Sequence, residues 1–386
     1  MEDNVQALSH PREDWRAVRS QRAVPSGLAA EDEARRMVFQ AALAQAEELW
    51  EAAAVAGPAS RPLPLFYCLS QAGRAVCAAW MGEEWRPHGH GLTRHVSEDP
   101  DPAKRVFDYG VSVTNQRRGI YRMVVDATRS VAFGGQASVA ELWASLPGFP
   151  RVDDEVAGNP PRPLLLEAAQ RRLQNPGNLI ELLAAPTRAL IPSLPETRPE
   201  ELPNTYPTMR GIEQDGTQSS PFGGDDDPIF RFLGEDGHPK PLHRIGARPL
   251  DDPHTFKKFV VRPKIGADAV EPPSEFLTLW ALLFCLSELA RYYPDAWVRA
   301  LDPDESTVAV TIEAGLDFSL ERAPALILQA LRGPIPRLIA EEFQQRREEA
   351  AAAVGQGGAE DERAEEAEEA EAHEDAEAGG GPYPDG

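Results

Sequence analysis

Two arginines and three histidines lie within one short segment of the sequence. Arg86 precedes His88 and His90, and Arg94 stands next to His95. Histidine titrates near neutral pH and serves as a general acid or base, whereas arginine binds a phosphate group through its planar guanidinium. His90 is therefore a candidate catalytic base, with Arg86 as a candidate phosphate contact. The alternative is a turn without chemistry, since closely spaced Gly and His residues also form loops.

The same segment has few ligands for a metal ion. No Cys, Asp or Glu follows at ligand spacing before Glu98 and Asp99, so we expect no metal site there. The chain also lacks a G-x-x-x-x-G-K-[ST] loop, a G-x-G-x-x-G turn and a G-x-S-x-G elbow. Ordinary kinase, dehydrogenase and hydrolase activities therefore lose their main support, and we expect no cofactor.

A second polar group ends the most apolar stretch of the chain. Glu288, Arg291 and Tyr292 follow a long run of large apolar residues and are themselves followed by Tyr293 and Trp297. On a helix, Glu288 can pair with Arg291 or Tyr292, and Arg291 is favourable beside the helix C-terminus. The pattern fits a structural ion pair with an aromatic plug, and it also fits a ligand contact.

Arg74 adds a further charge beside an apolar helix. We hypothesise that Arg74, His90, Arg291 and Tyr292 form one pocket for a small ligand or a partner protein, because polar residues recur beside the most apolar helices without a recognised catalytic pattern. Side chains more than about 15 Å apart cannot share such a pocket.

Three helices must position these groups. Residues 31 to 56 are rich in Ala, Glu and Leu without Gly or Pro, and residues 63 to 81 repeat apolar side chains at helical spacing. The strongest helix covers residues 275 to 293, between a capping Ser274 and the stop at Pro294. It is apolar nearly all round, which predicts a buried central helix.

The remaining elements are shorter. Residues 82 to 103 are predicted to be irregular and residues 105 to 133 to form short strands or a gated loop, while Ser138 and Glu141 form a capping box. Further predictions are helices at 176 to 184 and 316 to 331, the latter kinked at or starting from Pro324, and strands at 256 to 265 and 307 to 312. The predicted fold is a mainly helical α+β protein with central buried helices, short strands and a long irregular insertion.

Composition divides the chain into three parts. Residues 1 to 28 are predicted to be a loosely ordered arm, residues 29 to 345 the core, and residues 346 to 386 a disordered acidic tail. Within the core, residues 150 to 256 are the least regular part, and Pro and Gly concentrate at residues 190 to 256. Because structureless stretches of this length are uncommon in compact domains, we expect short strands or a mobile insertion there. From residue 360 to the end, twelve acidic residues face one basic residue and account for −11 of the net charge of −23. The remaining acidity disfavours a broad nucleic-acid surface.

The sequence favours a cytoplasmic location. Cys68, Cys77 and Cys285 lie in apolar runs and form no disulfide or zinc pattern, as in proteins of a reducing compartment. The N-terminus lacks the basic and apolar regions of a signal peptide, and the longest apolar stretch, from 277 to 290, is too short to span a bilayer. We therefore expect no membrane association.

Three blocks together resemble the YaaC family of bacterial proteins. They are the helix at 63 to 74 with the following Ala75, the triplet His90-Gly91-Leu92, and the run from 281 to 293 with Trp297; the marked positions of the first are Leu65, Phe66, Tyr67, Arg74 and Ala75. Their order and spacing suggest a resemblance over residues 40 to 330. The resemblance implies an organisation rather than a reaction.

The first of these helices is also similar to the Tyr-rich helix of HEPN-type domains, many of which cut RNA with an Arg, four to six residues, then His. That spacing occurs from Arg231 to His238 and from Arg248 to His254, about as often as chance gives, and in irregular sequence rather than at a helix start. Two hypotheses follow: a regulatory or scaffold-type protein with a ligand or partner pocket, or an HEPN-like RNase of defence type that uses His90 with Arg86 or Arg74.

Removal of the acidic tail tests the division of the chain. A protein without residues 350 to 386 is expected to stay soluble and to unfold in one cooperative transition, because the tail has too few apolar residues to contribute to a core. Circular dichroism during urea unfolding measures this. Loss of the cooperative transition in the truncated protein would contradict the assignment.

Overall fold

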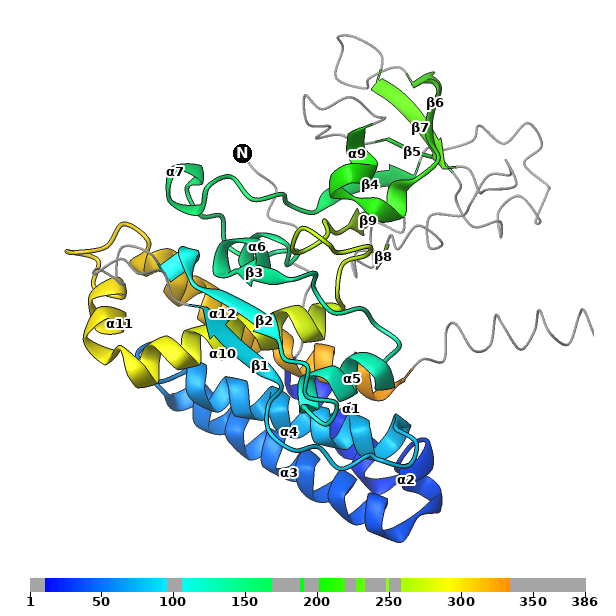
Figure 1. The fold of residues 1–386 in the computed structure, drawn as a ribbon, viewed down its shortest axis with the longest axis vertical. Helices are drawn as coiled ribbons and strands as arrows, with labels where there is room; N and C mark the ends of the chain where they lie inside the picture. Colours follow the sequence, from blue (N-terminus) through cyan, green and yellow to red (C-terminus); the bar gives the residue numbers. More distant parts are fainter. Residues whose placement is uncertain are drawn as a thin grey trace, which may run out of the picture. The chain divides into compact units, whose positions relative to one another are not determined.

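The computed structural model describes residues 11–95, 106–168, 188–190, 201–218, 227–232, 248–249 and 258–333. These residues fall in one compact unit that ends at Gly333. Helices predominate and short strands complete the fold, which confirms the predicted mainly helical α+β class (Figure 1).

Two long helices pack along each other at the base of the fold. Helix α3 covers Glu33–Val55 and helix α4 covers Pro62–Trp80. The Asp32 side chain caps α3 by accepting a hydrogen bond from the Arg35 N–H at 2.8 Å, and Pro62 begins α4, where its missing N–H costs nothing. Both helices follow the predicted bounds closely.

Helix α10, Glu275–Tyr292, is the centre of the core. The Ser274 side chain caps it, and it contacts α4, β1, β2 and three further helices (Figure 1). Nearly every residue from Glu275 to Leu289 is buried, as the all-round apolar pattern predicted. Gly73 lets α4 approach closely, because a Cβ there would lie 2.7 Å from the Trp280 ring.

The predicted loose arm is wrong for residues 11 to 28. Helix α1, Pro11–Ala23, packs against α3 and α12, and the short α2, Leu28–Glu31, follows it. Trp15 is buried with its ring centroid 5.8 Å from that of Trp50, and Arg22 lies 3.6 Å from the Glu47 carboxylate. One aromatic anchor and ion pairs therefore hold a segment whose composition looked loose.

A three-stranded antiparallel sheet lies beside α10. Its strands are β1 (Leu92–His95), β2 (Gly110–Val113) and β3 (Gln136–Ser138), with β2 in the middle. Ser138 and Glu141 then form the predicted capping box at the start of α6, Val139–Ala144.

Helix α5, Ile120–Ala127, occupies a segment predicted as strands or a gated loop. Its β-branched residues suggested strands, and Gly119 gives it no side-chain cap. Burial of Ile120, Tyr121 and Val124 against the core makes it a helix nonetheless. The strand β1 likewise lies in a stretch predicted to be irregular.

A second antiparallel sheet supplies the short strands expected within residues 150 to 256. Its strands, in the order β6-β7-β5-β4-β9-β8, are β4 (Leu164–Ala168), β5 (Arg188–Leu190), β6 (Ile212–Gln218), β7 (Asp227–Phe232), β8 (Arg248–Pro249) and β9 (Lys258–Val261). Short helical turns flank it: α7 (Asp154–Ala157), α9 (Leu202–Thr205) and the 3-10 turn Pro207–Met209. Of its strands, only β9 was predicted with bounds, and the helix expected at 176 to 184 lies outside the described residues.

The last described elements are α11, Pro294–Ala300, and α12, Ala309–Leu331. The strand predicted at 307 to 312 is wrong, because residues from Ala309 onward begin α12 and place Ile312 and Leu316 on one buried side. The helix continues through Pro324 rather than starting there. The tail predicted for residues 346 to 386 lies outside the described residues.

Arg262 joins the second sheet to the helices. Its guanidinium is buried and donates to the Ser145 carbonyl at 2.9 Å, to the Thr278 hydroxyl at 2.7 Å and to the Pro273 carbonyl. A buried arginine is tolerated only with such partners. The segment after β9 is thereby fixed to α6 and α10.

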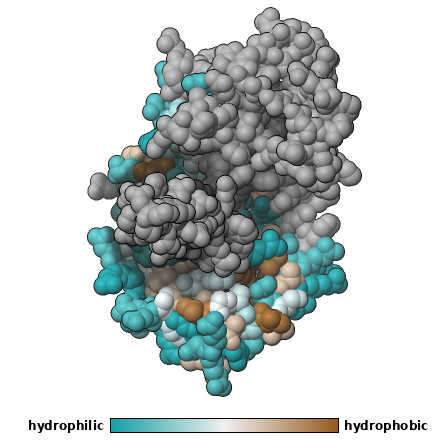
Figure 2. Space-filling model, turned by 90° about the vertical axis from the view of Figure 1, so that its right-hand side faces the viewer, coloured by the Kyte–Doolittle hydropathy of each residue, from teal (hydrophilic) through white to brown (hydrophobic). Residues whose placement is uncertain are grey.

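The surface differs from the core in the expected way. On the face shown in Figure 2, hydrophilic residues predominate among those coloured, with hydrophobic ones between them. No helix of the described part of the chain combines the length and apolar composition that crossing a bilayer requires. Cys68 and Cys77 on α4 and Cys285 on α10 are free and buried.

Substitution of Gly315 by Ala tests the packing of α12. Alanine normally stabilises a helix interior relative to glycine, but a Cβ at Gly315 would lie 2.0 Å from the Trp143 ring. Because that ring is held between Phe107 and Phe149, we expect a loss of about 1–3 kcal/mol in the free energy of unfolding. The exposed Glu313→Ala on the same helix is the control, and a gain in stability for Gly315→Ala, measured by urea unfolding, would show that the ring is free to move.

Candidate functional site

A charged and aromatic cluster forms where α10 ends. Arg94, on β1, lies 3.6 Å from the Glu288 carboxylate, and Arg291 pairs with the same carboxylate. The Arg94 guanidinium also lies 4.9 Å from the Tyr292 ring centroid and 5.3 Å from that of Tyr293. Arg291 lies 5.1 Å from the Tyr292 ring. We call Arg94, Glu288, Arg291 and Tyr292 the α10 end surface.

Tyr109 packs against Tyr293, next to the α10 end surface. Its ring lies edge-on to Tyr293 with the centroids 6.2 Å apart, and its buried hydroxyl has no hydrogen-bond partner within the described structure. Burial raises the pKa of Tyr109 to about 12, with a further increase from Tyr293 and an opposing effect of Arg94. The phenol is therefore neutral at physiological pH and cannot serve as a base there.

Two of the four residues of the predicted pocket are in direct contact. Arg291 and Tyr292 are in contact, and the predicted pair of Glu288 with Arg291 is confirmed. His90 lies farther back along α10, where its ring centroid is 5.2 Å from that of Phe284. Among the described residues, no hydrogen bond, ion pair or ring contact joins Arg74 to His90 or to Arg291.

The contacts of His90 hold the fold in place. Its Nδ1 accepts a hydrogen bond from the Leu92 N–H at 3.2 Å, which turns the chain into β1. Arg86, the other catalytic candidate, stacks on Trp85 at 4.9 Å, and its carbonyl accepts from the Arg118 guanidinium at 2.7 Å. No hydrogen bond or ring contact between Arg86 and His90 occurs in this described segment.

Residues 88 to 91 pair with a second segment through their main chain. The His88 N–H donates to the Arg118 carbonyl at 2.7 Å, and the carbonyls of Gly89, His90 and Gly91 accept at 3.1, 3.2 and 2.9 Å from residues 120, 121 and 114. Gly91, at φ 77°, also meets Gly119 so closely that a Cβ on it would lie 2.9 Å from the Gly119 Cα. The His-Gly segment thus fixes the turn at 114 to 119.

That turn forms one wall of a cleft with a volume of about 540 Å³. Polar residues dominate its lining, and the other wall comes from α5 and from the residues after α4. The charged and amide residues of the lining are Glu84, Asn115, Gln116, Arg117, Arg118, Arg122 and Asp126. We call it the arginine cleft; none of the ligand-binding candidates predicted from sequence lines it.

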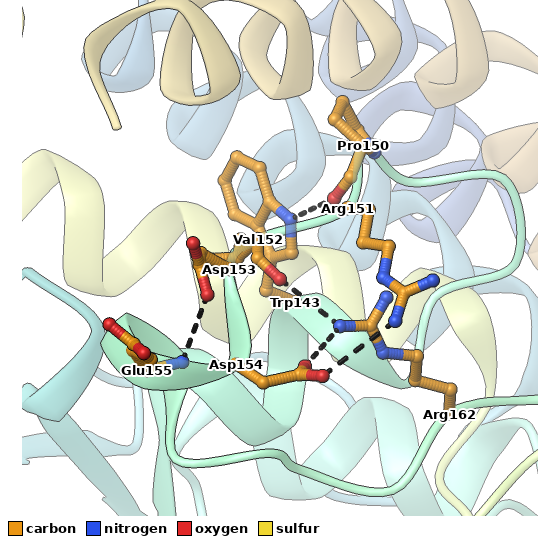
Figure 3. A network of polar contacts seen from close by, with 8 residues as sticks. All are labelled: Trp143, Pro150, Arg151, Val152, Asp153, Asp154, Glu155 and Arg162. Atoms are coloured by element: carbon orange, nitrogen blue, oxygen red, sulfur yellow. Dashed lines mark hydrogen bonds and ion pairs between the residues drawn. The ribbon is translucent and has the colours of Figure 1, made fainter. Parts of the chain in front are cut away.

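Another polar network is internally satisfied. Figure 3 shows Arg162 donating to the Asp154 carboxylate at 2.8 Å and to the Val152 carbonyl at 3.1 Å, while Arg151 lies 3.6 Å from the same carboxylate. The Trp143 indole N–H donates to the Pro150 carbonyl at 2.8 Å. These contacts anchor the loop after α6 and leave few polar atoms of the network available to a ligand. In the part of the chain with described side chains, no three His, Cys, Asp or Glu residues gather as a metal site would require.

The comparison with protein families settles the family. The model described as YaaC-like Protein matches residues 15–331 of the chain. The chain belongs to the YaaC-like family. This confirms the resemblance seen in the three sequence blocks, and the structure gives two of those blocks a role in the YaaC-like fold. His90-Gly91-Leu92 helps to hold the turn at 114 to 119, and the 281 to 293 run forms most of the buried α10 and its C-cap.

Comparisons with curated proteins and with solved structures found no match. The two Arg–His spacings considered for an HEPN-type nuclease end at His238 and His254, which lie outside the described residues.

The sequence pattern did not indicate Tyr109 or Arg117 as site residues. The sequence grouped Arg94 with the histidines, whereas in the structure Arg94 on β1 contacts Glu288 of α10. The adjacent pair Arg117-Arg118 before Gly119 could have indicated Arg117.

Two tyrosine substitutions test whether the Tyr109 hydroxyl lacks a partner. Tyr109→Phe is expected to leave the free energy of unfolding unchanged or to raise it by up to about 1 kcal/mol, because it removes a buried unpaired group. Tyr121→Phe is expected to lower it by about 1 kcal/mol, because that hydroxyl donates to the Leu277 carbonyl at 3.2 Å. Urea unfolding at neutral pH measures both. Equal losses for the two variants would show that Tyr109 has a hydrogen-bond partner.

Proposed function

We propose that this YaaC-like protein is a regulatory or scaffold-type protein that binds a partner protein at the α10 end surface. The observation that carries the proposal is the state of Tyr292. Its side chain is 58% exposed, yet two guanidinium groups, from Arg94 and Arg291, lie over its ring. A large ring left at the surface and held in place is typical of a contact residue.

The order of these side chains favours binding. Arg94 and Arg291 share the carboxylate of Glu288, which is only 12% exposed, and the Arg291 Nε also donates to the Ser287 carbonyl at 3.3 Å. Because the side chains are already restrained, a partner would cost them less conformational entropy on binding. Tyrosine and arginine are also the residue types that contribute most at protein interfaces.

The charge of the surface indicates the chemistry of the partner. Two arginines face one carboxylate, so the α10 end surface has one positive charge in excess. Tyr292 adds an exposed apolar face. A partner that presents an Asp or Glu next to an aromatic or aliphatic side chain would match both features.

Of the original four-residue pocket, Arg291 and Tyr292 belong to this surface, whereas Arg74 and His90 do not. The RNase hypothesis gains no support from the geometry. The Nδ1 atom of His90 accepts from its own chain, and Arg86 stacks on Trp85 instead of facing His90.

Crosslinking at position 292 tests the proposal. A photoreactive phenylalanine analogue replacing Tyr292 in the full-length protein, irradiated in cells of the native host, is expected to give one discrete adduct with another protein. Mass spectrometry of the purified adduct identifies the partner. A second substitution, Arg94→Ala, is expected to reduce the adduct at least fivefold, since it removes one guanidinium from the surface.

The control places the same analogue at Val310, which is 68% exposed on α12. The two positions are similarly accessible but only one adjoins the arginines. The same adducts from both positions, or adducts at 292 that persist in Arg94→Ala, would exclude the α10 end surface as the binding site.

A further inference from the structure

We propose that the arginine cleft binds a small molecule through a phosphate monoester group. The cleft lies between the turn at 114 to 119 and α5, and it is a different site from the α10 end surface. The inference does not depend on the proposed function, because it uses other residues and other contacts.

The arginines of the cleft have unused hydrogen-bonding capacity. Arg117 is exposed and makes no hydrogen bond or ion pair in the described structure. Arg118 uses one terminal nitrogen on the Arg86 carbonyl, and its buried Nε has no hydrogen-bond partner within the described residues. Arg122 lies 3.5 Å from the Asp126 carboxylate, but both side chains are half exposed, so water screens that pair.

The turn that carries Arg117 and Arg118 is fixed before any ligand arrives. Its main chain makes two hydrogen bonds to residues 88 to 91, at 2.7 and 2.9 Å, and the first two residues of α5 make two more to the same segment, at 3.1 and 3.2 Å. Gly91 and Gly119 are in contact, so the two segments pack against each other through their main chains. Preorganised donors lose little entropy on binding, and a guanidinium offers parallel N–H groups that match two phosphate oxygens.

The charges of the cleft select a compact anion. Three arginines face Glu84 and Asp126, so the lining carries one positive charge in a protein whose net charge is −23. A single phosphate group near Arg117 and Arg118 would be attracted locally. An extended polyanion such as an RNA strand would be repelled by the two carboxylates and by the rest of the molecule.

The size and remaining lining indicate the rest of the ligand. A volume of about 540 Å³ lies within the range of small-molecule sites. Asn115 and Gln116 add amide donors and acceptors, while Met123 and Phe133 add apolar surface. A phosphorylated metabolite with a polar ring, of about the size of a mononucleotide, matches this lining.

Calorimetry on the full-length protein tests the site. The probes are AMP as a phosphate monoester, adenosine as the same molecule without phosphate, and inorganic phosphate. Succinate is the control for charge alone, because it is a dianion with planar carboxylates instead of a tetrahedral phosphate. AMP or inorganic phosphate is expected to bind, with AMP at least tenfold tighter than adenosine, and succinate is expected to bind at least tenfold more weakly than the phosphate probe that binds. Affinity is expected to fall as salt rises, because the contacts are ionic.

Matched variants locate the binding. Arg117→Ala is expected to weaken phosphate binding about tenfold, and Arg118→Gln by a similar factor, since charge-assisted hydrogen bonds are lost. Arg210→Ala removes an exposed arginine that does not line the cleft and is expected to leave the affinity unchanged. Arg117 is exposed, so its variant is expected to fold even if Arg118→Gln does not.

Several results would overturn the inference. They are the absence of binding for both AMP and inorganic phosphate at 10 mM, succinate binding as tightly as phosphate, and equal affinities of Arg117→Ala and Arg210→Ala. The last result would show that phosphate binds elsewhere on the protein.

Discussion

The need to cover α10 on all sides governs the rest of this structure. Its residues are apolar around nearly the whole circumference, so no face of the helix can be left to water without a large loss of hydrophobic free energy. Helices α4, α6, α11 and α12 and strands β1 and β2 all contact it. The close approach of α4 at Gly73, and the anchoring of Arg262 at Thr278, both serve this one requirement.

This constraint also decides where polar groups can appear. The charges of α10 lie at its two ends: Glu275 in the first turn pairs with Arg322, and in the last turn Glu288 and Arg291 are joined by Arg94 from β1. Strand β1 directly follows residues 88 to 91, the segment that fixes the turn at 114 to 119. Residues 88 to 95 therefore connect two sites: they hold the turn that borders the arginine cleft, and they contribute Arg94 to the α10 end surface.

The sequence could predict what local pattern determines. Helices α3, α4 and α10 follow from periodicity, caps and prolines, and the pair of Glu288 with Arg291 follows from helical spacing. Arg94 could not be assigned to that pair, because its position depends on how β1 packs on α10. Helix α5 was missed because burial outweighed the strand preference of its β-branched residues. The bounds and pairing of the second sheet could not be predicted, because strands far apart in sequence must meet.

The three cysteines have a chemical consequence. Cys68, Cys77 and Cys285 are all buried, and burial raises the pKa of each thiol, that of Cys77 to about 12. At neutral pH almost none of the thiolate needed for reaction with peroxide or an alkylating reagent is present. The native core is therefore inert toward oxidants, and its thiols become reactive only when the core around α4 and α10 opens, so that thiol modification records this opening.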